Sequence, residues 1–241
     1  MWPYQQLKTQ PMFTDISKDH ILFIDIETVS QYADYHLLPE EQKKFWDYKS
    51  ASLFRNDSEA IPEKTYERAA IYAEFGKIIC ISSGYIRAGK LNMRSFVHQD
   101  ERELLLEFSE ALSRIESSGT KWALCAHNGK EFDFPYIARR MMIQGVRLPS
   151  MLDARGKKPW EISNIDTMEL WKFGDMKQFV SLNLLASVFN IPSPKDDIDG
   201  SMVGKVYYQD QDIGRIQQYC EKDVLTLCRV YLKLAGEPDI C

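Results

Sequence analysis

Short apolar runs alternate with longer amphipathic segments along this chain. Four runs have the length and β-branched content of buried strands: 20–28, 75–82, 91–97 and 122–127. The turn residues at 87–90 predict that the second and third strands form an antiparallel hairpin. Segment 101–117 has apolar residues three or four positions apart, which is the spacing of an amphipathic helix.

The remaining segments read as helices, one short strand and loops. Helices are expected at 31–74, 134–144, 168–173, 182–189 and 212–234, a short fifth strand at 162–165, and a polar loop at 195–200. Residues 1–19 carry little pattern and are expected to form an irregular arm. Interleaved strands and helices without a low-complexity linker predict one α/β domain over residues 1–241.

Composition narrows the class of protein. A formal net charge of −5 argues against a protein that coats nucleic acid tightly and without specificity. The five cysteines have no CxxC spacing, which indicates free thiols in a reducing cytosol, so we expect a cytoplasmic protein. No run approaches the roughly 18 apolar residues of a membrane span, and the first residues lack a signal-peptide layout.

The first strand runs directly into Asp25-Ile26-Glu27. Side chains two apart in a strand point to one face, so the two carboxylates lie side by side. At roughly 5 Å and an effective dielectric constant of about 20, they repel by about 3 kcal/mol. A bound Mg²⁺ or Mn²⁺ would turn this repulsion into coordination. The alternative is that the pair lies at a solvated strand end or caps a helix.

Two further acidic positions follow. Asp133 falls between the end of the fourth strand and the start of a helix, where α/β sheets place ligand sites. It could instead be only an N-cap, and His127 and Asn128 only turn formers. Tyr219 and Asp223 stand four residues apart on the last helix and therefore share a face. Here the alternative is a Tyr–Asp hydrogen bond at the edge of the core.

Taken together, Asp25/Glu27, Asn128…Phe132-Asp133 and Tyr219-x-x-x-Asp223 occur in an order that resembles the DEDD superfamily of 3′–5′ exonucleases, in its tyrosine variety (DEDDy). The chain is most similar to the predicted proofreading-type exonucleases related to family-B DNA polymerases. Three further motifs fit that group: 75–79, 171–174 and 197–201. The resemblance covers roughly residues 20–235. It implies a ribonuclease-H-like fold, with a mixed five-stranded sheet flanked by helices.

The resemblance also implies a mechanism. Asp25, Glu27, Asp133 and Asp223 would bind two divalent cations, Mg²⁺ or Mn²⁺, roughly 4 Å apart. Tyr219 would orient the attacking water. The backbone N–H groups of Thr28 and Val29 would hold the terminal sugar, and Asn128 and Phe132 would contact the terminal nucleotide. The expected partner is a nucleic acid with a free 3′ end, most simply single-stranded DNA, with any polymerase or repair partner left open.

Two departures from the family pattern stand out. The stretch 31–74 is a helical insertion after strand one, longer than most superfamily members carry there. The chain also contains no polymerase domain, so it would act alone or with a partner.

Six basic residues and one acidic residue lie between Arg139 and Lys158, followed by Trp160. This run could contact nucleic acid or be a solvated face.

The residues leave two other functions open. The same chemistry could act on RNA, because the sequence does not show how a 2′-hydroxyl would be received near Thr28. A catalytically silent nucleic-acid-binding module with this fold is a second alternative, although such a module would have no need of the tyrosine and all four acids. A Ca²⁺-binding protein is excluded because no D-x-D-x-D-G loop with a distal Glu is present.

Overall fold

One mixed sheet forms the centre of the fold. The computed structural model describes residues 16–57, 59–175, 177, 179–192 and 198–240. Five strands pair in the order β3-β2-β1-β4-β5. They are β1 (Ile21–Ser30), β2 (Gly76–Arg87), β3 (Lys90–Phe96), β4 (Ala123–Ala126) and β5 (Ile165–Asp166). The α/β class and the mixed five-stranded sheet predicted from the sequence are confirmed.

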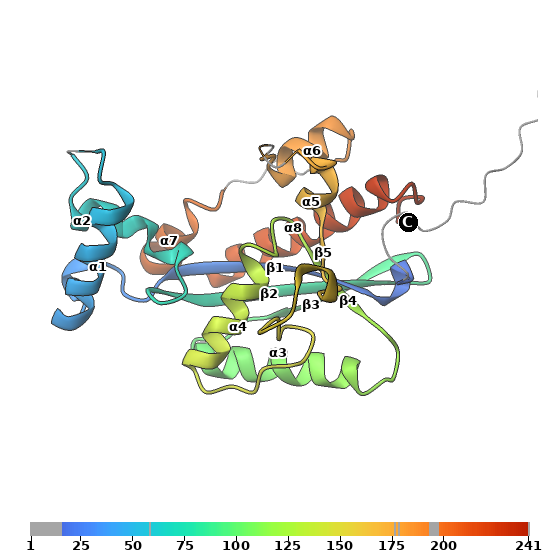
Figure 1. Ribbon diagram of the computed structural model, residues 1–241, viewed down its shortest axis with the longest axis horizontal. Coiled ribbons are helices and arrows are strands. Elements are labelled where there is room, and N and C mark those ends of the chain that lie inside the picture. Colours follow the sequence, from blue (N-terminus) through green and yellow to red (C-terminus); the bar gives the residue numbers. More distant parts are fainter. Residues whose placement is uncertain (1–15, 58, 176, 178, 193–197, 241) are drawn as a thin grey trace, which may run out of the picture.

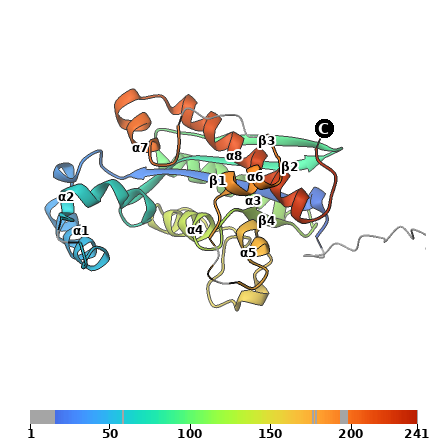
Figure 2. The same cartoon turned by 90° about the horizontal axis from the view of Figure 1, so that it is seen from above.

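Helices cover both faces of the sheet (Figures 1 and 2). They are α1 (Glu40–Leu53), α2 (Pro62–Thr65), α3 (Glu101–Glu116), α4 (Asp133–Ile143), α5 (Thr167–Lys172), α6 (Leu182–Val188), α7 (Val203–Lys205) and α8 (Ile213–Leu234). α3 and α4 lie on one face and α8 on the other (Figure 1). Among the described residues, no helix is long and apolar enough to cross a membrane.

The central strand β1 is longer than its neighbour β4. It pairs with β2 antiparallel over eight registered positions, from Phe23 to Ser30. Its parallel pairing with β4 covers only positions 21–23. Beyond Phe23, the edge of β1 that faces β4 is therefore left without a strand partner on that side.

The alternation of side chains along β1 determines which of them point to each face of the sheet. Leu22, Ile24 and Ile26 pack into the core that includes α3 and α4. Ile21 and Phe23 pack into the core that includes α8. The strand period of two therefore directs Asp25 and Glu27 toward α8.

Residues 31–74 are less helical than predicted. They contain α1, α2 and two short 3₁₀ segments, and they lie at one end of the sheet (Figure 1). Pro62 is the first residue of α2, and Pro39 is the N-cap of α1. A small core built around the fully buried Trp46 holds the segment together, and the Trp46 indole donates to the carbonyl of Pro62 at 2.9 Å. That it is a separate insertion in a single domain stays a prediction.

Several other predicted element boundaries differ from those in the structure. β2 continues five residues past the predicted end, because the hairpin with β3 stays paired to Arg87. The fifth strand is at 165–166, and the prediction at 162–165 was too early, because pairing with β4 starts only at Ile165. α7 and the π-helical turn Val206–Asp210 were not predicted. Residues 1–15 of the predicted arm 1–19, residues 195–197 of the predicted loop 195–200 and Cys241 lie outside the described residues.

One member of the basic run is a structural residue. Arg140 is 1% exposed and forms a two-pronged ion pair with Glu101, with Nε donating to Oε1 at 2.8 Å and Nη2 to Oε2. Arg140 Nη1 also donates to the carbonyl of Ala73 at 2.8 Å, and Glu101 accepts the backbone N–H of Ile78 at 2.7 Å. The pair therefore fastens α3, α4 and β2 together, and Arg140 is removed from any nucleic-acid surface.

We expect Arg140→Ala to lower the free energy of unfolding by about 3–5 kcal/mol, because it leaves the buried Glu101 carboxylate without its cation. Urea denaturation measures the change. Arg114→Ala is the matched control, since its pair with Glu110 is exposed and should contribute less than about 1 kcal/mol. Equal losses in the two variants would contradict the assigned role of the buried pair.

Candidate active site

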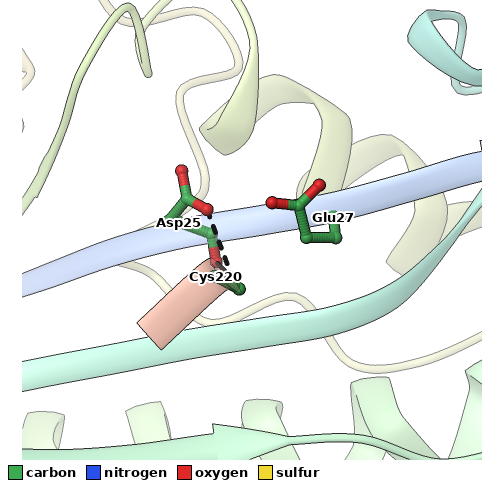
Figure 3. Close-up of side chains that lie close together, drawn as sticks. All are labelled: Asp25, Glu27 and Cys220. Atoms are coloured by element: carbon green, nitrogen blue, oxygen red, sulfur yellow. Dashed lines mark hydrogen bonds between the residues drawn. The ribbon is translucent and has the colours of Figure 1, made fainter. Parts of the chain in front are cut away.

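Two carboxylates on β1 form the centre of the site. Figure 3 shows Asp25 and Glu27 projecting from the strand, with Cys220 of α8 beside them. The Cys220 thiol donates to Asp25 Oδ2 at 3.3 Å, and its sulfur also lies 3.4 Å from the Asp25 carbonyl oxygen. One potential ligand atom from each of these three residues lies within 4.8 Å of the others.

Asp133 joins this pair from α4. It is the first residue of the helix, where Phe132 is the N-cap and makes no side-chain capping bond. The Asp133 carboxylate is 4% exposed and accepts the backbone N–H of Ile26 and its own N–H. The N–H of Ile26 is available because β1 extends past its pairing with β4. The carboxylate therefore lies against β1 at Ile26, which stands between Asp25 and Glu27 in the strand, and the alternative that Asp133 is the N-cap of α4 is wrong.

α8 supplies the remaining acid and the tyrosine. Tyr219 and Asp223 lie on the same face of the helix, and their side chains are hydrogen-bonded to each other. Asp223 is close enough to act electrostatically on both Asp25 and Glu27. The Tyr219–Asp223 hydrogen bond, which was the alternative interpretation of this pair, therefore forms beside the other acids and does not exclude the predicted site.

Electrostatics show how tightly the acids are gathered. Burial raises the pKa of Asp25 well above its usual range, and the charges of Glu27, Asp223 and Asp133 raise it further. Burial and then Asp223 raise the pKa of Glu27 in the same way. Burial raises the pKa of Asp133 to about 7. Burial and then Asp223 also raise the pKa of the Tyr219 hydroxyl.

This donor set fits a hard divalent cation. The charged groups that shift the pKa of Asp25 are all carboxylates. Oxygen ligands with unbalanced negative charge are what Mg²⁺ and Mn²⁺ prefer. Cys220 adds a sulfur at the edge of the cluster, but its thiol is already committed to Asp25.

A buried aspartate missed by the sequence analysis shapes the loop before Asp133. Asp166, at the end of β5, is 2% exposed and accepts the backbone N–H groups of Asn128 at 2.9 Å and Lys130 at 3.1 Å. It also caps α5 by accepting the N–H of Met168 at 2.9 Å. The spacing Asp166-x-x-Glu169 is typical of a helix start and could have revealed the cap, though not the contact with the loop.

His127 and Asn128, two polar residues of the loop 127–132, differ in how their side chains are bonded. Both ring nitrogens of His127 are used, one with Thr167 Oγ1 at 2.9 Å and the other with the carbonyl of Val180 at 2.8 Å, so His127 is structural. Asn128 adopts a left-handed conformation with φ of 60°, as a turn former does. Its side-chain oxygen is buried and has no hydrogen-bond partner in the described part of the chain.

The structure places the three other predicted substrate contacts near the carboxylates. Thr28 is half-buried, and its hydroxyl is hydrogen-bonded to the hydroxyl of Tyr136. The Val29 side chain is fully buried in the core beneath α8, so only its backbone could serve a substrate. Phe132 is half-buried, with its ring centroid 5.3 Å from that of Tyr136.

The packing around Tyr136 explains a glycine in the motif at 75–79. The Tyr136 hydroxyl donates to the carbonyl of Ala70 at 2.8 Å. A Cβ atom on Gly76 would lie 2.2 Å from this hydroxyl and 3.0 Å from the carbonyl oxygen of Val29. Any side chain at position 76 would therefore displace the contacts that support β1 beside Glu27.

Comparison with known proteins agrees with the geometry. A family B DNA polymerase from the hyperthermophilic archaeon Pyrobaculum calidifontis is similar in structure, with a TM-score of 0.54 over 88% of this chain at 14% sequence identity. The chain spans only 24% of that polymerase. This similarity, together with the mixed sheet, shows a ribonuclease-H-like α/β fold.

Residues 71–237 match the family described as "predicted 3′–5′ exonuclease related to the exonuclease domain of PolB", and the chain belongs to that family. The search of curated proteins gave no match. The matched range contains Asp133, Tyr219 and Asp223 but begins after Asp25 and Glu27. It is the fold that places the carboxylates of β1 beside those of the matched segment.

Asp133→Asn should stabilise the ion-free protein at high pH. The pKa of Asp133 is about 7 in the folded state against about 3.9 when unfolded, so the native state binds more protons between these values. Stability therefore falls as the pH rises from about 4 to about 7, and the penalty persists above that. In EDTA we expect the variant to exceed wild type by about 1–4 kcal/mol at pH 8 and to equal it near pH 4.

Urea denaturation at both pH values tests this expectation. Asp153→Asn is the control, because Asp153 lies outside the acidic cluster and its pKa is lowered to about 2 by its hydrogen bonds with Arg155. That variant should gain no stability at pH 8. A gain for Asp133→Asn that did not depend on pH would show that the carboxylate charge is not its cause.

Proposed function

We propose that this chain removes nucleotides from the 3′ end of single-stranded DNA by hydrolysis that depends on divalent cations. The observation that carries the proposal is the convergence of four carboxylates, from β1, α4 and α8, on one point of the central strand. Membership of the exonuclease family supports the reaction class. A silent binding module with this fold would gain nothing from mutually repelling buried acids, which lower its stability.

Asp25, Glu27, Asp133 and Asp223 would hold two divalent cations. When bound, such ions lower the pKa of the attacking water and stabilise the leaving 3′ oxygen. Asp25 is the residue best placed to serve both ions, because the other three carboxylates all act on it. Cys220 and the Ile26 N–H would keep Asp25 and Asp133 in fixed orientations through their hydrogen bonds.

Tyr219 would position the attacking water. Burial and the nearby carboxylates raise its pKa, so its hydroxyl stays protonated at neutral pH. A protonated hydroxyl is a hydrogen-bond donor and a poor base. This supports orientation of the water by Tyr219, as the sequence analysis proposed, and assigns the removal of the proton to another acceptor.

The terminal nucleotide would lie between β1 and the loop 127–132. The buried side-chain oxygen of Asn128 could accept a hydrogen bond from it, and Phe132 could contact its base. The backbone N–H groups of Thr28 and Val29 would receive the sugar. The Thr28 hydroxyl donates to Tyr136 and keeps its acceptor lone pairs, so this contact does not select between DNA and RNA. The family's relation to the exonuclease domain of PolB supports DNA as the substrate.

Digestion of 5′-labelled DNA and RNA of one sequence tests the proposal. With Mn²⁺, we expect a ladder that shortens from the 3′ end of the DNA, and none in EDTA or with Asp25→Ala. Loss of one carboxylate from this site should lower the rate at least 100-fold, the scale of losing a group that stabilises the transition state. A ladder on RNA alone would show that the substrate is RNA and not DNA. No ladder on either, from a folded protein, would overturn the enzyme assignment.

Ion binding can be measured without substrate. Millimolar Mn²⁺ or Mg²⁺ should raise the melting temperature, because the ions bind the folded state and relieve repulsion among the acids. Asp25→Asn should lose most of this rise. Asp153→Asn, whose carboxylate lies outside the site, should keep it. A rise that survives in Asp25→Asn would place the ions elsewhere.

A further inference from the structure

A large apolar cavity lies on the outer face of α4. Its volume is about 840 Å³, within the range of pockets that bind small organic groups. Phe134, Ala138 and Met142 of α4 line one wall, and Leu148, Leu152 and Ile162 line the other. The carboxylate site makes no use of these residues.

The cavity is continuous with the loop that leads into the carboxylate site. Lys130 and Glu131 line its mouth, and Phe134 directly follows Asp133 in the first turn of α4. The groove therefore begins within one helical turn of an acid assigned to the site and runs along the helix away from it. A strand whose 3′ end reached Asp133 would have its preceding nucleotides beside this opening.

The rim carries cations that remain available. Lys130 is paired with Glu169 at 2.6 Å and Arg155 with Asp153 at 2.7 Å. Arg139 and Lys157 also line the cavity, and within the described residues neither forms an ion pair. Two acids, Glu74 and Glu131, line the rim as well, so the local charge is balanced and contact would be confined to individual phosphates.

An exposed aromatic residue extends the surface. A second cavity of about 310 Å³ shares Lys130, Ile162 and Glu169 with the first and is also lined by Trp160. The Trp160 side chain is 78% exposed, with Lys158 Nζ 5.2 Å from its ring centroid. An exposed aromatic ring beside a cation is the usual platform for stacking an unpaired base.

We propose that this surface, the α4 groove, binds the nucleotides that precede the 3′-terminal one in a single-stranded substrate. Bases would enter the apolar groove, Arg139 and Lys157 would contact phosphates, and Trp160 would stack on a base further along. The inference rests on the proposed function and deepens it. A protein segment would also suit the apolar walls. The contribution of Lys130 and Glu131, from the loop before Asp133, to the lining of the groove and the two cations that form no ion pair with a described residue favour nucleic acid.

Fluorescence anisotropy with 5′-fluorescein single-stranded DNA tests the groove directly. A 5′-fluorescein mononucleotide, which has no preceding nucleotide, and a twelve-nucleotide DNA are compared in EDTA, where no hydrolysis should occur. Arg139→Ala and Lys157→Ala should each weaken binding of the longer DNA by roughly three- to tenfold and reduce its salt dependence by about one phosphate contact. Ala138→Trp, which fills the groove, should weaken it more than about tenfold. The mononucleotide should bind all variants equally.

Two matched controls come from another surface cavity. Arg147 belongs to the same basic run but lines a separate cavity of about 670 Å³ together with Ser113 of α3. Arg147→Ala and Ser113→Trp therefore repeat the charge removal and the filling at a site outside the groove, and they should leave binding unchanged. Melting temperatures of all variants show whether each one is folded.

The outcomes separate the two proposals. If wild type shortens DNA with Mn²⁺ but groove variants and controls bind the longer DNA alike, the groove inference is wrong and the exonuclease assignment stands. If wild type neither binds nor shortens either nucleic acid, both fail. A loss shared by the mononucleotide and the twelve-nucleotide DNA would place Arg139 and Lys157 at the terminal nucleotide and overturn the groove assignment.

Discussion

Mutual repulsion among two buried and two half-buried carboxylates is the constraint on which the rest of this structure depends. Asp25 lies in the centre of the sheet, and three other acids raise its pKa. Such a cluster lowers the stability of the ion-free fold, so other interactions must hold the carboxylates in place. The hydrogen bonds from Cys220 and the Ile26 N–H do this locally, while the apolar cores on both faces of the sheet do it globally.

The unequal lengths of β1 and β4 make the cluster possible. Had β4 continued beside β1, the N–H of Ile26 would bond to a neighbouring strand and Asp133 would have no place beside it. Because the pairing ends at Phe23, the chain can turn through 127–132 and bring the start of α4 against β1. Asp166 then fixes that turn through two backbone N–H groups. The site can therefore form only because β4 is short.

Local patterns in the sequence were enough to predict most elements and the acidic set. Alternation in β1 indicated that Asp25 and Glu27 share a face, and helical spacing did the same for Tyr219 and Asp223. The sequence could not show which face of the sheet α8 covers. It therefore could not reveal that Cys220, some 200 residues away along the chain, bonds to Asp25.

The errors share a physical cause, because each involves a contact between two different elements. Arg140 looked like one of six exposed cations, and only the packing of α3 against α4 shows that Glu101 binds it in the interior. The end of β2 depended on pairing with β3, and the role of Asp166 on a loop 38 residues earlier. The spacing of residues along the chain does not predict such contacts, since it describes one element at a time.

The site forms only when elements on both faces of the sheet are packed in place. Its acids come from β1, α4 and α8, and the last two elements touch opposite faces of the sheet. None of these elements could hold the carboxylates together alone, because repulsion would separate them as soon as the packing loosened. Binding of a cation would act in the opposite direction and draw the three elements together. The stability of the fold and the competence of the site are therefore coupled through the same four side chains.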